Sequence, residues 1–402
     1  MDEKTVLVSG AGIAGPTLCY WLKVAGFKPT LIERSASLRR GGYVIDFWGA
    51  GYDIAERMGL QADIDETGYH MREMRIVDGQ NNRVAGFGIN VFRELAGDRF
   101  VTLRRSDLSQ LLFVTVAHTI ETIFDEEVTG LEERKNCVRV QFKRSGERDF
   151  NLVIGADGLH SNIRKLVFGP QDRFEKRLDY AVAAFEVAGY EPRDENVYVT
   201  FNEPGRMAAR LALRNDRTLF LFVFATDKDS PNPTSDVSAQ KAMLWERFGD
   251  RAWECPRILR ELDRVQDLYF DCVSQIRMDS WSQGRVALVG DAAFCVSLMA
   301  GQGAALAMIA AYVLAGELAK ADGKYMAAFA NYEVLLRDFI GSKQRGAEHF
   351  ASAFAPRTGW GLFLRNQVIR ALAIPGLAKF TFGKDIIDTL ELPEYRWPEL
   401  GA

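Results

Sequence analysis

The stretch GAGIAG, residues 10–15, has the glycine spacing of a turn that binds a pyrophosphate. Gly10 permits a tight turn, Gly12 lets a phosphate reach the backbone, and Gly15 lets the following helix pack closely. The first N–H groups of that helix favour a negative charge. Glu33 ends the next apolar run, PTLIE, where its carboxylate can accept hydrogen bonds from ribose hydroxyls. The pattern predicts a dinucleotide site without distinguishing NAD from FAD, and a glycine turn kept only for packing is the alternative.

Two later apolar runs also end on an acid, and this repetition favours FAD. The run NLVIGADG ends on Asp157 and Gly158, and the run VALVGD ends on Gly290 and Asp291. A nicotinamide enzyme with one nucleotide fold does not need two further acids of this kind. FAD is a longer molecule, so one acid can meet its ribityl hydroxyls while a helix end meets its isoalloxazine ring. We therefore predict FAD as the cofactor.

The tripeptide GQG, residues 301–303, predicts the start of a helix, and a helix end is one place where an isoalloxazine ring can be met. Gly301 and Gly303 leave the backbone bare, so a flat ring can approach it closely. Reduced flavin carries negative charge, which a helix N-terminus stabilises by about 0.3–2 kcal/mol. The alternative is that GQG only starts a buried, alanine-rich helix.

These motifs need parallel strands joined by helices, and they lie far apart in the sequence. Residues 4–9 form a short apolar run with β-branched members, which is typical of a buried parallel strand. The apolar and alternating runs within 171–275 predict a sheet that lies over the flavin. We predict three units: a discontinuous FAD-binding domain at 1–70, 101–170 and 276–320, a substrate-binding sheet domain at 71–100 and 171–275, and a C-terminal helical segment at 321–402.

The composition excludes several functional classes. The chain has 402 residues, enough for two or three domains, and a net charge of −4 with acids and bases interspersed, so no nucleic-acid partner is expected. Its five cysteines include no C-x-x-C pair and its four histidines are dispersed, which predicts reduced thiols and no metal site. No signal peptide and no apolar run of membrane-spanning length are visible. These features predict a cytoplasmic protein, and they are compatible with a monomer.

On its three glycine and acid motifs, the sequence resembles the FAD-dependent group A monooxygenases, the aromatic-hydroxylase family. The motifs occur in the family's order from residue 10 to residue 303. Within the family, the stretches ERSASLRRGGYVID, LRRSDLSQLL and AYVLAGEL resemble the branch that contains tetracycline-inactivating monooxygenases. The resemblance implies an α/β protein with a Rossmann-like FAD-binding domain of the GR2 type, an inserted, mainly antiparallel substrate sheet and C-terminal helices.

The resemblance also assigns residues to the cofactor. It implies that Asp291 holds the ribityl chain and that the 301–319 helix points its N-terminus at the pyrimidine edge of the flavin. Asp46 stands where related chains carry an acid beside the flavin, although a turn acid is the alternative. The family places an arginine near the flavin at Arg39, for which Arg40 is the alternative, and an FAD-contacting arginine at Arg105, for which Arg104 is the alternative. Arg164 could equally brace the strand end at Asp157. The remaining implied FAD contacts are Ala14 and Arg34.

The sequence indicates the residues that contact the substrate less clearly than those that contact FAD. Four phenylalanines could line a pocket, with core packing as the alternative for each: Phe92, Phe201, Phe222 and Phe224. The family commonly has His, Pro and Asn or Ser where this chain has Phe294, Leu298 and Ala305. These departures make the wall near the reactive ring more apolar, and a dry wall protects reactive intermediates from water.

The resemblance implies a complete reaction. NADH or NADPH reduces FAD, dioxygen then gives a flavin hydroperoxide, and this oxygenates a phenolic or polycyclic aromatic substrate, for which a tetracycline-like polyketide is one candidate. No residue stands out as a catalytic acid or base. Two alternatives stay open: a flavin dehydrogenase or oxidase that inserts no oxygen, and a binding protein for hydrophobic small molecules with structural FAD.

Overall fold

The computed structural model describes residues 4–39, 41–91, 99–227, 236–298, 301–322, 324–372 and 390–397. Its first large sheet has six strands, of which five are parallel. In spatial order they are β17 (Ser282–Gln283), β18 (Val286–Leu288), β11 (Leu152–Gly155), β1 (Thr5–Ser9), β2 (Lys28–Glu33) and β7 (Glu121–Phe124). The strands are almost continuously apolar because helices cover the sheet.

The strand order brings distant motifs to one edge of this sheet. β1 pairs with β2 on one side and with β11 on the other, and Ser9 is level with both Ile32 and Gly155. Gly155 is in turn level with Leu288 of β18. The carboxyl ends of these four parallel strands therefore meet, and the order reverses direction at β1, which is where open α/β sheets bind ligands.

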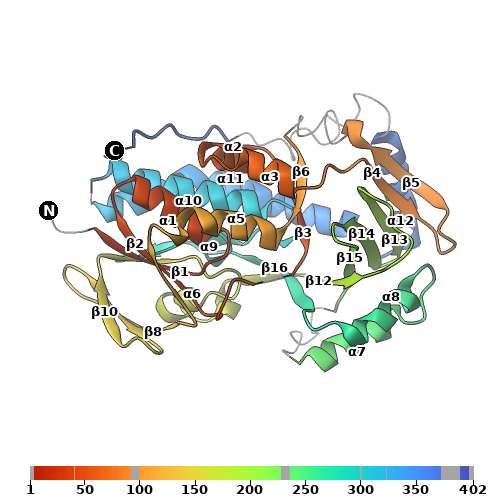
Figure 1. Ribbon diagram of the computed structural model, residues 1–402, viewed down its shortest axis with the longest axis horizontal. Coiled ribbons are helices and arrows are strands. Elements are labelled where there is room, and N and C mark those ends of the chain that lie inside the picture. Colours follow the sequence, from red (N-terminus) through yellow and green to blue (C-terminus); the bar gives the residue numbers. More distant parts are fainter. Residues whose placement is uncertain are drawn as a thin grey trace.

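Helices cover the side of the sheet seen uppermost in Figure 1. They are α1 (Ala14–Val24), α2 (Ala50–Arg57), α3 (Gln61–Thr67), α5 (Arg105–Ala117), α10 (Gly303–Lys320) and α11 (Tyr325–Phe354). Among the described helices, α10 is long and apolar enough to cross a membrane by length and composition, which the sequence analysis did not anticipate, but 83% of it is buried inside the protein. It packs on α1, α2 and α11, and a helix that is apolar all round is expected in such a central place.

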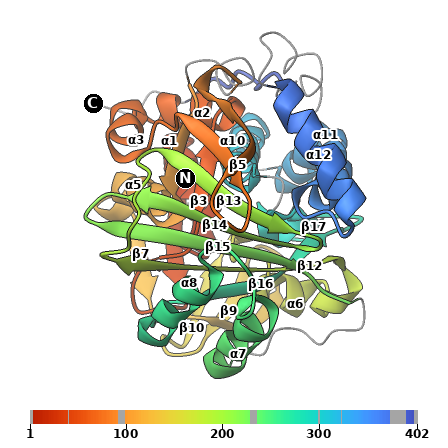
Figure 2. The same cartoon turned by 90° about the vertical axis from the view of Figure 1, so that its right-hand side faces the viewer.

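The second large sheet has seven strands and is mainly antiparallel (Figure 2). In spatial order they are β16 (Tyr269–Ile276), β12 (Glu175–Ala188), β15 (Arg217–Ala225), β14 (Arg206–Leu213), β13 (Val197–Glu203), β4 (Glu73–Val77) and β5 (Arg83–Gly88). The expectation that 171–275 consists of strands is wrong in part, because α7 (Val237–Phe248) and α8 (Cys255–Glu261) lie within it. Both helices bury an apolar stripe, including Leu244, Phe248 and Ile258, against one face of the sheet.

Smaller elements connect the two sheets. β3 (Val44–Phe47) pairs with β6 (Val101–Arg104), and Tyr69 bridges to Thr102 beside them. A separate antiparallel sheet contains β8 (Val128–Glu133), β9 (Val138–Phe142) and β10 (Glu147–Phe150). The short helices α6 (Asn162–Val167) and α9 (Asp291–Phe294) follow β11 and β18. The described residues also include short 3₁₀ helices at Gln171–Arg173 and Leu262–Arg264.

Two C-terminal pieces return to earlier parts of the chain. The helix α12 (Gly359–Leu372) packs on β5 and β13, with Ile369 buried against Ile76. Residues 390–397 lie across α10, where the indole of Trp397 stacks on that of Trp21 with ring centres 4.9 Å apart. A Cβ atom on Gly316 would collide with the ring of Tyr395, so glycine is required at this contact. The predicted fold class, an α/β FAD-binding fold with an inserted antiparallel sheet and C-terminal helices, is confirmed.

Candidate active site

The glycine turn closes the carboxyl end of β1 tightly. Gly10 has φ +112°, and a Cβ atom there would lie 2.6 Å from the carbonyl oxygen of Ala156 in the neighbouring turn. A Cβ atom on Gly15 would lie 1.9 Å from the Gly10 carbonyl oxygen. The turn can therefore exist only without these side chains, and its backbone lies open to a cleft.

The cleft beside this turn has a volume of about 2100 Å³. It runs from the ends of the parallel strands to one face of the seven-stranded sheet. The predicted cofactor residues that line it are Gly10, Gly12, Ala14, Glu33, Arg34, Arg39, Arg105, Asp157, Gly158, Asp291, Gly301 and Gly303.

Glu33 is fixed at the end of β2 by the turn itself. Its two carboxylate oxygens accept hydrogen bonds from the backbone N–H groups of Ala11, at 2.9 Å, and Ser35, at 3.0 Å. A carboxylate oxygen has two lone-pair sites, so each retains one that can accept a bond from a ribose hydroxyl.

Three arginines place positive charge near the glycine turn. The Arg105 guanidinium lies 3.5 Å from the position that a Cβ atom on Gly12 would take. Burial, Arg34 and Arg105 lower the pKa of Arg39, and Glu33 opposes them. Cations that repel one another beside open N–H groups form a site for a pyrophosphate. Arg104, the rival of Arg105, instead bonds to Asp107 at 2.8 Å, and Arg40 lies outside the described residues.

The two strand-end acids have different surroundings. Asp157 accepts a 2.5 Å bond from the Ser161 hydroxyl and bonds of 2.8 and 3.0 Å from the N–H groups of Asn162 and Ile163. Its carboxylate thus caps α6. Asp291 lies at the N-terminus of α10, with one oxygen 3.9 Å from a Cβ atom placed on Gly303. Burial raises the pKa of Asp291, while Arg105 and a hydrogen bond with Cys295 oppose that rise.

Arg164 is completely buried and braces two of the motifs. Its guanidinium donates to the carbonyl oxygens of Ala292, at 2.8 Å, and Leu159, at 2.6 Å. It therefore ties the segment after β11 to the segment after β18. The guanidinium of Arg164 also donates to Gln171 Oε1 at 3.3 Å, and burial lowers its pKa while the charge of Asp157 opposes that change, which is compatible with the alternative role of a brace at this strand end. Its contact with FAD stays a prediction.

Gly290 marks the place where three segments converge. It has φ +65°, and a Cβ atom there would lie 3.3 Å from that of Ala14 on α1 and 3.4 Å from that of Ala307 on α10. A side chain at this position would push apart the two helices whose N-termini face the cleft.

Only some of the predicted substrate residues lie where the structure has a cleft. Asp46 and Leu298 line the cleft. Phe201, Phe222 and Phe224 do not, because they are at most 5% exposed and pack under α7 and α8 on the opposite face of the sheet. Phe294 is also placed elsewhere, since its ring lies 4.7 Å from that of Trp281 in the core. These four expectations are corrected, and Phe92 lies outside the described residues.

The error has a simple cause. Successive side chains of a strand alternate between faces, so the neighbours of the phenylalanines face the cleft. Seven aliphatic residues form this wall: Val182, Met207, Ala209, Leu211, Leu219, Leu221 and Val223. Four further residues that were not predicted from the sequence also line the cleft: Tyr43, Tyr198, Tyr269 and His160, whose ring bonds to Asp271 at 3.2 Å at the rim. The stretch TLFLFVFA alternates phenylalanine with leucine and valine, which indicates two faces of a strand. The alternation does not show which of the two faces the ligand.

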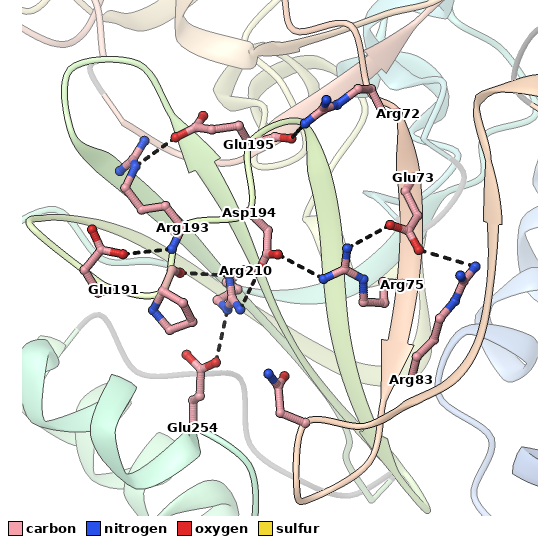
Figure 3. A network of polar contacts seen from close by, with 12 residues as sticks. Arg72, Glu73, Arg75, Arg83, Glu191, Arg193, Asp194, Glu195, Arg210 and Glu254 are labelled. Atoms are coloured by element: carbon pink, nitrogen blue, oxygen red, sulfur yellow. Dashed lines mark hydrogen bonds and ion pairs between the residues drawn. The ribbon is translucent and has the colours of Figure 1, made fainter.

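The opposite face of the sheet is held by charges as well as by aromatic packing (Figure 3). Arg210 has a side chain 2% exposed and bonds to Asp194 at 2.7 Å and Glu254 at 3.2 Å. Arg75 joins Asp194, at 2.9 Å, to Glu73, at 2.8 Å. This network fixes the strands that form the wall of the cleft.

The chain matches the model of the FAD binding domain family over residues 3–323. It belongs to this family. A flavin-dependent monooxygenase of Legionella longbeachae is 32% identical over 97% of this chain and 98% of its own length. An uncharacterised protein of Mycobacterium tuberculosis is 38% identical over 85% of this chain and 92% of its own. The crystal structure of the tetracycline destructase Tet(55) superposes with a TM-score of 0.83 at 32% identity, over 98% of this chain and 99% of that one.

These similarities confirm that the protein is a flavin-dependent monooxygenase of the aromatic-hydroxylase type, in the branch predicted from the motifs, and that FAD is its cofactor. They favour oxygen insertion over the dehydrogenase and binding-protein alternatives. The turn that tolerates no Cβ atom, the mutually repelling arginines and the open α10 N-terminus suit the pyrophosphate and ring of FAD. When bound, FAD supplies the redox chemistry and oxygen activation that no side chain can supply. The protein's own residues hold the cofactor, exclude water and orient the substrate.

Proposed function

We propose that the protein uses NADPH or NADH to insert one oxygen atom into a phenolic or polycyclic aromatic small molecule of tetracycline-like shape. One observation carries the proposal: a single cleft joins the cofactor motifs to an aliphatic sheet face. Its volume of about 2100 Å³ exceeds the roughly 300–1,000 Å³ of a typical ligand site, so a polycyclic substrate has room beside FAD.

The chemistry of the wall supports a flat, largely apolar substrate. The seven aliphatic residues named above offer contact area without hydrogen bonds, and Tyr43, Tyr198 and Tyr269 add hydroxyl groups at its margin. Leu298, which stands where the family commonly has proline, packs with Val182 and Met207 on the same wall. The apolar substitution thus extends the dry surface instead of interrupting it.

The test is aerobic incubation of the FAD-loaded enzyme with NADPH or NADH and a panel of tetracyclines and phenolic polyketides. We expect substrate-dependent consumption of the nicotinamide and a product heavier by one oxygen atom, detected by mass spectrometry. Oxidised product without added oxygen would contradict the proposal.

A variant of the wall sharpens the test. Ala209→Phe fills the cleft from β14 and should raise KM or abolish turnover while FAD stays bound. Val334→Phe, at a position 78% exposed on α11, adds a comparable ring away from the cleft and should leave turnover unchanged.

A further inference from the structure

Three oxygen atoms from three strands form a closed triangle at the edge of the cleft. Asp46 Oδ1, on β3, lies 2.5 Å from Thr102 Oγ1, on β6, and 2.7 Å from the hydroxyl oxygen of Tyr198, on β13. The two hydroxyl oxygens are 2.9 Å apart. Thr102 is completely buried, whereas Asp46 and Tyr198 line the cleft.

The triangle has three oxygen–oxygen contacts, but its two hydroxyl groups supply only two hydrogen atoms. Every side is within hydrogen-bonding distance, but with Asp46 ionised, Thr102 and Tyr198 can fill only two of the three. A proton on Asp46 fills the third, so that each oxygen donates once and accepts once. In the ionised form both hydroxyls donate to the carboxylate, and a proton that arrives at Asp46 finds an acceptor in the same triangle.

The electrostatic surroundings agree with this count. Burial raises the pKa of Asp46, and only the hydrogen bonds from Thr102 and Tyr198 oppose that rise. The other ionisable groups nearby are engaged or neutral: on β6, Arg104 bonds to Asp107, and burial raises the pKa of Tyr43, next to β3, to about 12. The pKa of Tyr198 is raised well above its usual value. The first turns of α10, which packs on β3, carry no ionisable side chain.

We propose that Asp46, positioned by Thr102 and Tyr198, accepts the hydroxyl proton of a phenolic or enolic substrate in the cleft. The substrate O–H bond breaks, its electron pair stays on the substrate oxygen, and the proton becomes the third hydrogen of the triangle. The substrate ring becomes more electron-rich, and no further reactant is needed. The inference rests on the proposed function, since it assigns the proton acceptor for a hydroxylated substrate.

The first experiment follows protonation directly, by infrared difference spectroscopy of the FAD-loaded, substrate-free enzyme during a pH titration. We expect a carboxylic-acid band that disappears as the pH rises and that is missing in Asp46→Asn. In Tyr198→Phe and Thr102→Val the band should persist to higher pH, because each variant removes a hydrogen bond that lowers the pKa of Asp46.

Thr200→Val is the matched control. Thr200 lies two residues from Tyr198 on the same strand and also lines the cleft, but it is outside the triangle, so the band should not move. The same carboxyl bands in wild type and Asp46→Asn at every pH would overturn the proposal.

The second experiment measures the pH dependence of kcat with tetracycline. In the wild type, kcat should fall on the acid side, where Asp46 is already protonated. In Asp46→Asn, kcat should be at least tenfold lower and without that acid limb, and in Tyr198→Phe the limb should lie at higher pH. If Asp46→Asn turns tetracycline over as fast as the wild type, the role of Asp46 is refuted. If the wild type does not turn tetracycline over, the proposed substrate is refuted, and the infrared titration then decides the role of Asp46.

Discussion

The strand ends at Asp157 and Asp291 have similar sequences and different surroundings in the structure. Both acids follow a buried parallel strand; α6 begins a few residues after Asp157, and α9 begins at Asp291 itself. The Asp157 carboxylate accepts three hydrogen bonds from the start of α6, which tie it to the scaffold and leave one lone-pair site on Oδ1. Asp291 instead stands in the cleft beside the start of α10 and the charge of Arg105. A motif therefore places an acid at the edge of the sheet where ligands bind. Whether its carboxylate is available to a ligand depends on the hydrogen-bond donors around it.

The largest expected effect comes from Arg164, which joins the two strand ends. Arg164→Met would leave the buried carbonyl oxygens of Ala292 and Leu159 without a donor, at about 1–3 kcal/mol each. Urea unfolding should therefore show a loss of roughly 2–5 kcal/mol with and without FAD. Lys165→Met, at the exposed next position, should change stability by less than about 0.5 kcal/mol. Weaker FAD binding with normal apo-protein stability would mean that Arg164 serves the cofactor.

Asp157→Ala should also lower the free energy of unfolding, by less than Arg164→Met does. It removes the acceptor of the Ser161 hydroxyl and of two N–H groups at the start of α6, so we expect a loss of about 1.5–3 kcal/mol. Thermal unfolding should show the loss in apo-protein and holo-protein alike, with Asp157→Asn in between. A loss confined to the holo-protein would remove the distinction between the two acids.

Asp291→Ala should do the opposite, by weakening FAD binding while sparing the apo-protein. A charge-assisted bond to a ribityl hydroxyl contributes about 1.5–3 kcal/mol, which is roughly a tenfold to hundredfold change in Kd. Asp291→Asn should fall between wild type and Ala in an FAD titration. A destabilised apo-protein with unchanged FAD affinity would show that Asp291, too, is scaffold.

The pH dependence of FAD binding sharpens that test. Burial raises the pKa of Asp291, so its carboxyl group gains a proton at a higher pH than an exposed aspartate. Because the ionised form is the better acceptor, FAD affinity should fall as the pH is lowered through that pKa. Asp291→Asn should lack this fall.

The smallest effect is expected from Ser161, which accepts from the N–H of Arg164 and caps α6. Ser161→Ala should cost about 1 kcal/mol in urea unfolding, and Ser161→Thr, which keeps the hydroxyl, should retain most of the stability. FAD affinity should stay at the wild-type value in both. A larger effect on FAD than on unfolding would place the α6 cap in the cofactor site.

The sequence was most informative where backbone geometry alone fixes position. Gly10, Asp157 and Asp291 follow parallel strands and Glu33 ends one, and parallel strands bring their carboxyl ends to one edge whatever their side chains do. The dinucleotide site and FAD followed from that rule, whereas the family and the fold class followed from the resemblance of the motifs. The rule could not reveal that the Asp157 carboxylate is bonded to the start of α6, since this depends on the donors Ser161 and Asn162 in one particular turn.

Side-chain direction was predicted less well. Phe222 and Phe224 were candidates for the pocket, but Leu221 and Val223, the residues just before them, face the cleft, because the register to β14 and the position of α7 select the face. The triangle of Asp46, Thr102 and Tyr198 was equally hidden. Its members come from three strands far apart in sequence, and only the packing of β3 and β6 against the large sheet brings them together.

The contact of residues 390–397 with α10 has a consequence for biosynthesis. Trp21, near the beginning of the chain, completes its packing only when Trp397 arrives, and Gly316 receives Tyr395 in the same way. At about 5–20 residues per second, the ribosome needs on the order of half a minute to a minute to deliver that segment after α1 has emerged. Throughout that interval the nascent cofactor domain exposes an aromatic surface that α10 and the later segment will cover, so its yield in cells should depend on chaperones that shield it.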